Sequence, residues 1–271
     1  MNEQHLRVAV TAAKAGAVEL MARREHRVVQ EKAPKDLVTD ADLASQQAIR
    51  AILLDAFDDY AFVGEEEGEN EPLDSVRRGT LDAPPCWVVD PLDGTVNYVH
   101  SLQSFAVSIA LYAKGKMRLG VIYDPVTDEM FTAIDGAGAK CNDQPIHCSD
   151  CIDISEALIA CSFPVGVKGG DPEVTRFVRV LEQCRSLRRL GSCALNMCYV
   201  AAGRLDAYWA TSVAAWDSAA GTVIAREAGA VLTAYDGTPL DDWKPRLCVS
   251  ASQGVHQSMI PLLSDSVVVN A

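Results

Sequence analysis

Two carboxylates directly follow an apolar run, at a position where a lone charge is costly to bury. The run begins with Trp87-Val-Val, and Asp90 and Asp93 follow it with a Pro-Leu step between them. A carboxylate removed from water needs a cation or hydrogen-bond donors, so a positive group is expected beside Asp90. Because the Pro-Leu step bends the chain, both carboxylates and the carbonyl of Leu92 can face one point. Oxygen ligands of this kind suit a hard divalent cation.

The next two residues are suited to an anion. Gly94 lets the backbone approach a ligand closely, and the N–H groups that open a helix at Thr95 can receive a negative charge. Acidic ligands beside such a cradle are typical of a phosphate bridged to metal ions. Two further acids have comparable positions: Glu65 follows the apolar run that ends at Val63, and Asp217 opens a helix of small apolar residues.

The acids outside the Asp90 segment each have a purely structural alternative. The acidic run at residues 65–67 could be a solvated loop, as charge runs usually are. Asp217 could be a helix N-cap, and Asp42 could be a first-turn acid that complements the helix dipole. A strand that leaves through a turn does not explain Asp90, an acid at the end of so apolar a run. The segment around Asp90 is therefore the strongest candidate for a functional site.

Three motifs together resemble the signatures of the inositol monophosphatase family. They are Gly64-Glu65-Glu66, Trp87-Val-Val-Asp90-Pro-Leu-Asp93-Gly94-Thr95-Val-Asn97-Tyr-Val-His100 and Trp216-Asp217-Ser-Ala-Ala220-Gly221, in that order and spacing. The similarity extends to residues 36–42 and 191–197 and so covers nearly the whole chain. The resemblance implies an α/β protein with the layered αβαβα sandwich of sugar phosphatases. It also implies Mg²⁺-dependent hydrolysis of phosphate monoesters, and often a homodimer and sensitivity to lithium.

The resemblance assigns roles residue by residue. The groups that match the family's metal ligands are Glu65, Asp90, the Leu92 carbonyl, Asp93 and Asp217. Asp42 and Thr95 match the pair that orients the attacking water, and Glu65 is expected to be catalytic as well as a ligand. Two or three Mg²⁺ ions are expected to bind phosphate oxygens and lower the pKa of a bound water, so that no covalent enzyme intermediate is required.

The expected substrate pocket departs from the family pattern at one position. Its residues are Asp93, Gly94, Thr95, Cys193, Ala210 and Asp217. Members that act on inositol phosphates often have a Glu at the position of Ala210, where it binds ring hydroxyls. Alanine cannot accept those hydrogen bonds. Thr211 or Ser212 could take over the role of the Glu. We expect myo-inositol monophosphate to be the substrate, with fructose 1,6-bisphosphate, histidinol phosphate or 3′-phosphoadenosine 5′-phosphate as alternatives. A non-catalytic relative that binds metal or phosphate ranks last, because every expected ligand is present.

Hydrophobic spacing predicts the elements that position these residues. It predicts a helix over residues 6–21, a polar loop over 31–35, and a second helix after Thr39 or Asp40. The buried face of this second helix is expected to carry Leu43, Ile49, Ile52, Leu53 and Phe57. Strands are predicted at 60–63 and 86–89, with a mobile acidic excursion over 65–85 between them. Runs at 105–111, 119–123 and 130–134 predict an antiparallel meander.

The pattern changes beyond about residue 145. Strands predicted at 157–161, 207–210, 230–234 and 247–250 alternate with helices predicted at 172–184, 194–202 and 216–227. This alternation predicts an α/β half, residues 146–271, that supplies Asp217 and the substrate pocket. It follows an α+β half, residues 1–145, that carries most metal ligands. The two halves are expected to form a single compact catalytic unit.

Composition limits the partners of the protein. Of 271 residues, 37 are Asp or Glu and 24 are Lys or Arg, which gives a net charge of −13. Without a basic run, neither a nucleic-acid polymer nor a membrane is an expected partner, and the expected ligand is a small phosphate ester held through metal ions. Nine scattered cysteines and the polar N-terminus favour a reducing, cytoplasmic location. Cys148-Ser-Asp-Cys151 has the spacing of half a zinc site, but no second such pair completes it.

Overall fold

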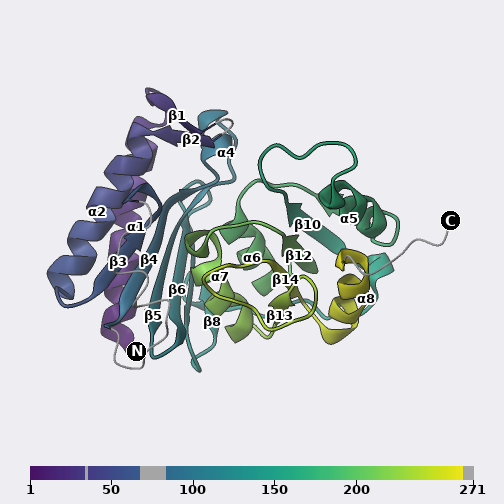
Figure 1. The fold of residues 1–271 in the computed structure, drawn as a ribbon. Helices are drawn as coiled ribbons and strands as arrows, with labels where there is room; N and C mark the ends of the chain where they lie inside the picture. Colours follow the sequence, from purple (N-terminus) through teal and green to yellow (C-terminus); the bar gives the residue numbers. More distant parts are fainter. Residues whose placement is uncertain (34–35, 68–83, 265–271) are drawn as a thin grey trace.

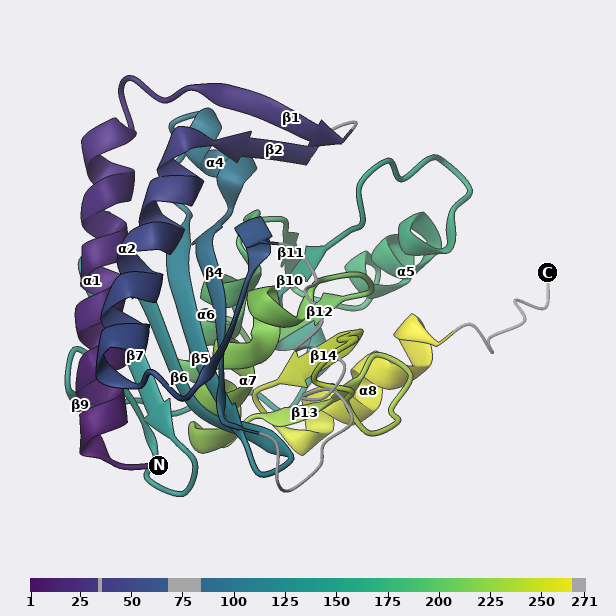
Figure 2. The ribbon, with the colours of Figure 1, turned by 60° about the vertical axis from the view of Figure 1, so that its left-hand side comes forward.

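The computed structural model describes residues 1–33, 36–67 and 84–264 (Figure 1). Most of the acidic stretch predicted over residues 65–85 lies outside these residues, so its mobility stays a prediction. Helices and sheets alternate in layers, as Figure 2 shows from a second side. The helices α1 (Glu3–Arg23) and α2 (Asp40–Ala56) cover one face of a seven-stranded sheet, and their buried side chains form one core with it.

The helices α6 (Cys193–Ala201) and α7 (Ala215–Glu227) form the middle layer between the two larger sheets. The outer face of the five-stranded sheet is covered by α5 (Pro172–Leu181) and α8 (Gln253–Leu263). The order of layers is therefore helix, sheet, helix, sheet, helix. The αβαβα sandwich expected from the sequence is confirmed, although α8 was not among the predicted helices.

The seven-stranded sheet contains the predicted meander. Its strands, in sheet order, are β3 (Ala61–Gly64), β4 (Cys86–Asp93), β5 (Ala106–Ala113), β6 (Lys116–Asp124), β7 (Glu129–Ile134), β8 (Ala139–Cys141) and β9 (Gln144–Pro145). Only the β3–β4 pair is parallel among these described strands, so the ends of both strands reach the same edge of the sheet. Glu65 and Asp90 are brought close by this pairing.

The five-stranded sheet mixes both strand directions. In sheet order its strands are β11 (Ser186–Arg188), β10 (Leu158–Ser162), β12 (Ala207–Ala210), β14 (Leu247–Ser250) and β13 (Val231–Ala234). β10 runs parallel to β11 and β12, whereas β14 is antiparallel to β12 and β13. All of these strands except β11 were predicted, since β11 is too short to show a pattern in the sequence.

Two local predictions were wrong. The polar loop expected over residues 31–35 begins as a strand, because β1 (Val29–Ala33) pairs with β2 (Asp36–Thr39) in a two-stranded ribbon. Leu43 was placed on the buried face of α2 but is 47% exposed. The buried stripe at the start of α2 is polar instead, with Asp42, Ser45 and Gln46 continuing into the apolar Ile49 and Leu53. Polar residues are buried there because this end of the helix faces the candidate site.

The middle layer depends on a close approach between α7 and β6. A Cβ atom added to Gly120 of β6 would lie 2.3 Å from the carbonyl oxygen of Ala220 on α7, so only glycine fits. This contact sets how closely α7, and with it Asp217, lies against the sheet.

In the part of the chain that the structure describes, no helix combines the length and apolar character needed to cross a membrane.

Candidate active site

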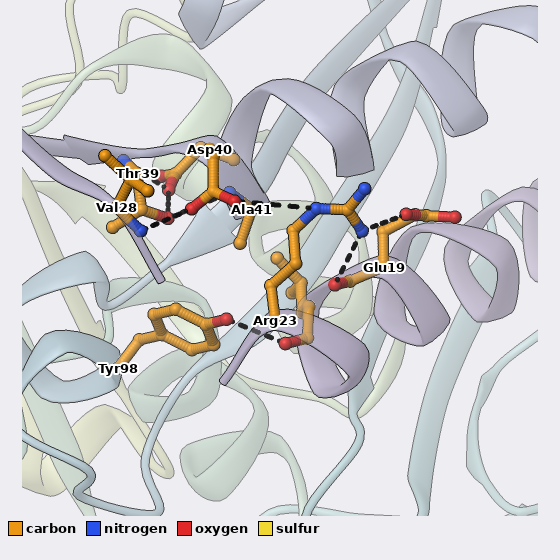
Figure 3. Close-up of polar contacts among 9 residues, drawn as sticks. Glu19, Arg23, Val28, Thr39, Asp40, Ala41 and Tyr98 are labelled. Carbon is orange, nitrogen blue, oxygen red and sulfur yellow. Dashed lines mark hydrogen bonds and ion pairs between the residues drawn. The ribbon is translucent and has the colours of Figure 1, made fainter. Parts of the chain in front are cut away.

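The start of α2 is anchored to its neighbours by a set of polar contacts (Figure 3). Asp40 Oδ1 accepts a hydrogen bond of 2.7 Å from Val28 N, and Asp40 Oδ2 lies 3.7 Å from Arg23 Nε. Tyr98 Oη donates to the carbonyl of Leu20 on α1 over 2.7 Å. These contacts join α1, α2 and the segment after β4, so they fix where the first turn of α2 lies.

Asp42 is held in that first turn by Thr39 and lies beside Thr95. Its Oδ2 accepts hydrogen bonds from Thr39 Oγ1 at 2.5 Å and Thr39 N at 2.9 Å, which is a capping box. Thr95 Oγ1 lies 3.4 Å from Asp42 Oδ1 and 3.1 Å from the carbonyl oxygen of Leu92. Burial raises the pKa of the Asp42 carboxyl to about 6, although the bonds from Thr39 lower it. The pair expected from the sequence is therefore brought together.

The end of β4 bends between Asp90 and Asp93. The register of β4 against β5 shifts there, at Pro91, a residue that has no N–H to donate to the sheet. Asp90 is 1% exposed, and its Oδ1 accepts a hydrogen bond of 2.9 Å from Leu92 N. Burial raises the pKa of the Asp90 carboxyl well above its usual range, and the charges of Glu65, Asp93 and Asp217 raise it further.

The carboxylate of Asp93 lies against the N-terminus of α6. It accepts hydrogen bonds from Cys193 N at 3.1 Å, from Ala194 N at 2.9 Å and from the hydroxyl of Ser192. Burial raises the pKa of Asp93 to about 6, and these three bonds oppose the shift. The contact joins residues from the first and second halves of the chain. A negative charge at this position is also favoured by the dipole of α6.

Asp217 lies in the first turn of α7, where its Oδ2 accepts a hydrogen bond of 2.8 Å from Ala214 N. Ala214 is the N-cap, so the structural alternative that makes Asp217 the cap is wrong by three positions. Burial raises the pKa of Asp217 well above its usual range, and the charges of Asp93 and Glu65 raise it further. The side chain of Asp90 lies within hydrogen-bonding reach of Asp217. Asp217 therefore belongs to the same electrostatic cluster as Asp90 and Asp93.

Glu65 begins the short 3-10 helix η1 (Glu65–Glu67) directly after β3. The turn is fixed from α2, because Gln46 Oε1 accepts a hydrogen bond of 3.0 Å from Glu66 N. A Cβ on Gly64 would lie 2.3 Å from the same Gln46 oxygen, so a side chain at this position would displace the Gln46 amide from the contact. Gln46 was not predicted as a site residue; it stands one turn after Asp42 on the buried polar stripe.

The donor set fits a hard divalent cation. It consists of the carboxylates of Glu65, Asp90, Asp93 and Asp217 with the Leu92 carbonyl nearby, and the interactions that perturb the three aspartates include no positive charge. Oxygen donors in this number suit Mg²⁺ or a similar ion. Within residues 1–33, 36–67 and 84–264, no three acidic, histidine or cysteine side chains converge as metal ligands as they stand. Each of the three aspartates accepts a hydrogen bond from a backbone N–H group.

The segment after β4 has the form expected for an anion cradle. Gly94 is the N-cap of α4 (Thr95–Val99) and has a φ of 93°, a left-handed conformation that favours glycine. A Cβ there would also lie 2.8 Å from the carbonyl oxygen of Ser104. Gly94 has no side chain with which to cap the first N–H groups of α4, which lie next to Asp93. This arrangement leaves them suited to a phosphate oxygen.

The expected substrate-pocket residues come from two further elements. Cys193 is the first residue of α6 and is bound to Asp93 through its amide, and Ala210 is the fully buried last residue of β12. The next residue, Thr211, donates its hydroxyl hydrogen to Glu173 Oε1 of α5 over 2.8 Å. Sequence reasoning did not assign Glu173, Thr39 or Ser192 to the site. Thr39 was expected only as one of two possible caps of the second helix, and Ser192 is the N-cap of α6, which begins one residue before the predicted helix.

The sequence and the fold of this chain are both similar to those of known proteins. The model of the Inositol monophosphatase family matches residues 1–267. An inositol-1-monophosphatase of Mesorhizobium japonicum is 41% identical, covering 76% of this chain and 75% of its own, and the Nus factor SuhB of Pasteurella multocida is 39% identical, covering 86% and 85%. The solved structure of the extragenic suppressor protein suhB from Bartonella henselae has a TM-score of 0.87 at 32% identity, covering 97% of this chain and 99% of its own.

Proposed function

Because this chain belongs to the inositol monophosphatase family and is therefore a phosphoric monoester hydrolase, we propose that it hydrolyses a small phosphate ester with the help of Mg²⁺. The observation that carries the proposal is the carboxylate cluster formed by the buried Asp90 and Asp93 and the half-buried Asp217, which has no described cationic partner and lies beside the Asp42–Thr95 pair. A cluster of mutually repelling, buried carboxylates is costly unless a cation joins it.

We assign the metal to Glu65, Asp90, the Leu92 carbonyl, Asp93 and Asp217, with two or three ions in the working enzyme. When bound, Mg²⁺ supplies Lewis-acid stabilisation of phosphate oxygens and makes a water molecule more acidic. The N–H groups of Gly94 and Thr95 hold the phosphate. No residue of the cluster needs to attack the ester, so we propose direct attack by water without a covalent enzyme intermediate.

Asp42 and Thr95 position the attacking water. The hydroxyl of Thr95 has one hydrogen, which it donates either to Asp42 Oδ1 or to the Leu92 carbonyl. The lone pairs of its oxygen can then accept a hydrogen bond from water, and the Asp42 carboxylate is the group of the pair that can take up a proton. Asp42 has little freedom to move, because both Thr39 groups bind its other oxygen. The pair thus fixes the direction in which water approaches the phosphorus.

We propose myo-inositol monophosphate as the substrate. The support is the 41% identity to a protein named inositol-1-monophosphatase. Ala210 is the pocket residue that does not favour an inositol ring, because its methyl side chain cannot accept a hydrogen bond from a ring hydroxyl. Fructose 1,6-bisphosphate, histidinol phosphate and 3′-phosphoadenosine 5′-phosphate are the alternatives. Relatives named Nus factor SuhB are similar over most of the chain as well, so family membership alone does not select the substrate.

We further propose that the site is shared between an N-terminal half, residues 1–145, and a C-terminal half, residues 146–271. The hydrogen bonds from Ser192, Cys193 and Ala194 to Asp93 support this division of labour. Nine cysteines described as free thiols support a reducing, cytoplasmic location. A homodimer with lithium-sensitive activity is part of the same proposal, and sedimentation and assays with added LiCl test it.

Phosphate release tests the proposed function. Each of the four candidate esters is incubated with the full chain in Mg²⁺ and, separately, in EDTA. Turnover of myo-inositol 1-phosphate that EDTA abolishes supports the proposal, and faster turnover of another ester reassigns the substrate. If none of the four esters releases phosphate in Mg²⁺, the proposed activity is wrong.

A further inference from the structure

We propose that Asn97 is a positioning residue, which holds the anion cradle at the start of α4 against the N-terminus of α6. The inference rests on the proposed function, because the cradle is the part of the site to which the phosphate is assigned. Asn97 stands two residues after Thr95 and is 7% exposed. It therefore acts through the backbone groups that it binds.

The side chain of Asn97 joins two segments that are far apart in the sequence. Its Nδ2 donates over 2.7 Å to the carbonyl oxygen of Ser104, which leads into β5, and over 2.7 Å to the carbonyl oxygen of Leu190, which lies shortly before α6. These two hydrogen bonds form the Asn97 bridge. A side-chain amide has two N–H groups, so the bridge uses both of its donors.

Gly191 makes the bridge possible from the other side. Its φ of 88° is left-handed, a conformation that favours glycine. A Cβ at this position would lie 2.7 Å from Asn97 Nδ2 and 2.9 Å from Asn97 Oδ1. The backbone of Gly191 and the Asn97 amide are therefore in direct contact, with no space for a side chain between them.

The carbonyl oxygen of Ser104 connects the bridge to the cradle. It accepts from Asn97, and a Cβ on Gly94 would lie only 2.8 Å from it. The helix α4 has five residues, too few to be stable in isolation, and its N-cap Gly94 has no side chain with which to fix its start. The position of the cradle therefore depends on tertiary contacts such as the Asn97 bridge.

Residues 93–97 and 190–194 meet at two points. At one end, Asp93 accepts hydrogen bonds from the start of α6, and at the other end Asn97 donates to Leu190. Gly94 and Thr95, whose N–H groups are assigned to the phosphate, lie between these two points. Asp93 is also assigned to the metal, whereas Asn97 is neutral and donates only to carbonyl oxygens. The Asn97 bridge thus holds the cradle in place independently of the metal.

Replacing the amide with a carboxylate tests the bridge. Asn97→Asp keeps the shape of the side chain, but an ionised carboxylate has no donor and repels both carbonyl oxygens. We expect the KM for the ester and the Kd for inorganic phosphate in Mg²⁺ to rise together about tenfold, and kcat to change less than about threefold. The control is Asn142→Asp, which loses a similar bond to the Asp128 carbonyl after β8. It should leave all three constants unchanged.

A second variant disturbs the bridge without changing Asn97. Gly191→Ala places a methyl group against the Asn97 amide and should weaken phosphate binding to a similar extent. Gly136→Ala is its control, because Gly136 has a φ of 86° but no atom within 4 Å of its Cβ. Gly136→Ala should bind phosphate as the wild type does. The double variant of Asn97→Asp and Gly191→Ala should be no weaker than the weaker single variant, since both changes break one contact.

Thermal unfolding separates a positioning role from a purely structural one. If Asn97→Asp and Gly191→Ala lower the unfolding temperature but leave KM and the Kd for phosphate unchanged, the inference is overturned. If Asn97→Asp does not fold, Gly191→Ala decides by the same measurements.

Titration with inorganic phosphate also separates the inference from the proposed function. If the wild type hydrolyses none of the four esters, the proposed activity fails, and calorimetric titration with phosphate in Mg²⁺ still tests the bridge. Phosphate binding that Asn97→Asp weakens about tenfold supports the inference. Equal binding by both proteins, or no binding to the wild type, overturns it.

Discussion

Thr95 Oγ1 lies 3.4 Å from Asp42 Oδ1, although 53 residues separate the two in the sequence. The threonine begins α4 after the bend of β4, and the aspartate lies in the first turn of α2. The contact depends on the anchoring of α2 through Asp40 and on the glycine that precedes Thr95. Two elements that are distant in the sequence thus place a hydroxyl and a carboxylate where one water molecule can meet both.

Replacing Thr95 tests this pairing. Thr95→Ala removes the hydroxyl that links water to Asp42 and should lower kcat at least about a hundredfold with little change in KM, because positioned general-base catalysis contributes on that scale. Thr95→Ser keeps the hydroxyl and should restore most of the activity. Steady-state phosphate release gives both parameters. Equal activity of the alanine and serine variants would show that the hydroxyl has no part in the reaction.

The close contact between β6 and α7 leads to a second prediction, which concerns the stability of the protein. Gly120→Ala would bring a methyl group within 2.3 Å of the Ala220 carbonyl, so α7 must move. We expect the free energy of unfolding to fall by about 2 kcal/mol, a typical cost of overpacking, and activity to fall because Asp217 moves with the helix. Urea denaturation measures the change. Gly169→Ala is the matched control, since no atom lies within 4 Å of its Cβ, and it should be nearly neutral.

The sequence predicted the layers and the cluster because both leave local signals. Apolar, β-rich runs separated by turn residues mark the meander, and an acid such as Asp90 after an apolar strand marks a buried charge. The contacts that hold the site were less predictable, because they join distant segments. Gln46 and Glu173 are ordinary polar residues of helices in the sequence, and only the packing of α2 and α5 shows that they reach the 64–66 turn and Thr211.

The wrong prediction that Leu43 is buried also arises because the sequence does not show what this end of α2 packs against. An apolar residue in an amphipathic helix is expected to face the core, and Leu43 would do so if α2 were apolar along its whole buried face. Its first turns face a polar site instead, so Asp42, Ser45 and Gln46 occupy the buried stripe and Leu43 lies outside it. At this end of the helix, the polar residues that face the site are buried, and hydrophobic periodicity therefore does not identify the buried face.

The buried His256 predicts how stability depends on pH. Its Nε2 lies 3.0 Å from Thr233 Oγ1 and its Nδ1 3.1 Å from Ser250 Oγ, and burial lowers its pKa below 6.5. Below that pH the unfolded chain takes up a proton before the folded protein does, so the free energy of unfolding falls as the pH drops. His256→Gln removes this contribution and should reduce the loss of stability between about pH 7 and about pH 5.

Thermal unfolding across this pH range measures the difference between the two proteins. The exposed His26 provides a control, because His26→Gln should follow the wild-type profile. Parallel profiles for wild type and His256→Gln would show that His256 takes up its proton equally well in the folded protein.

Asp93→Asn tests the central claim, that the carboxylate cluster binds Mg²⁺ and thereby hydrolyses a phosphate ester. The amide keeps the size of the side chain, and its one oxygen can still accept from one of the two N–H groups of α6, but it cannot balance the charge of Mg²⁺. Calorimetric titration with Mg²⁺ and phosphate release should both be lost, with cooperative thermal unfolding retained. Near-normal Mg²⁺-dependent turnover by the folded Asp93→Asn protein would contradict the assignment of the site.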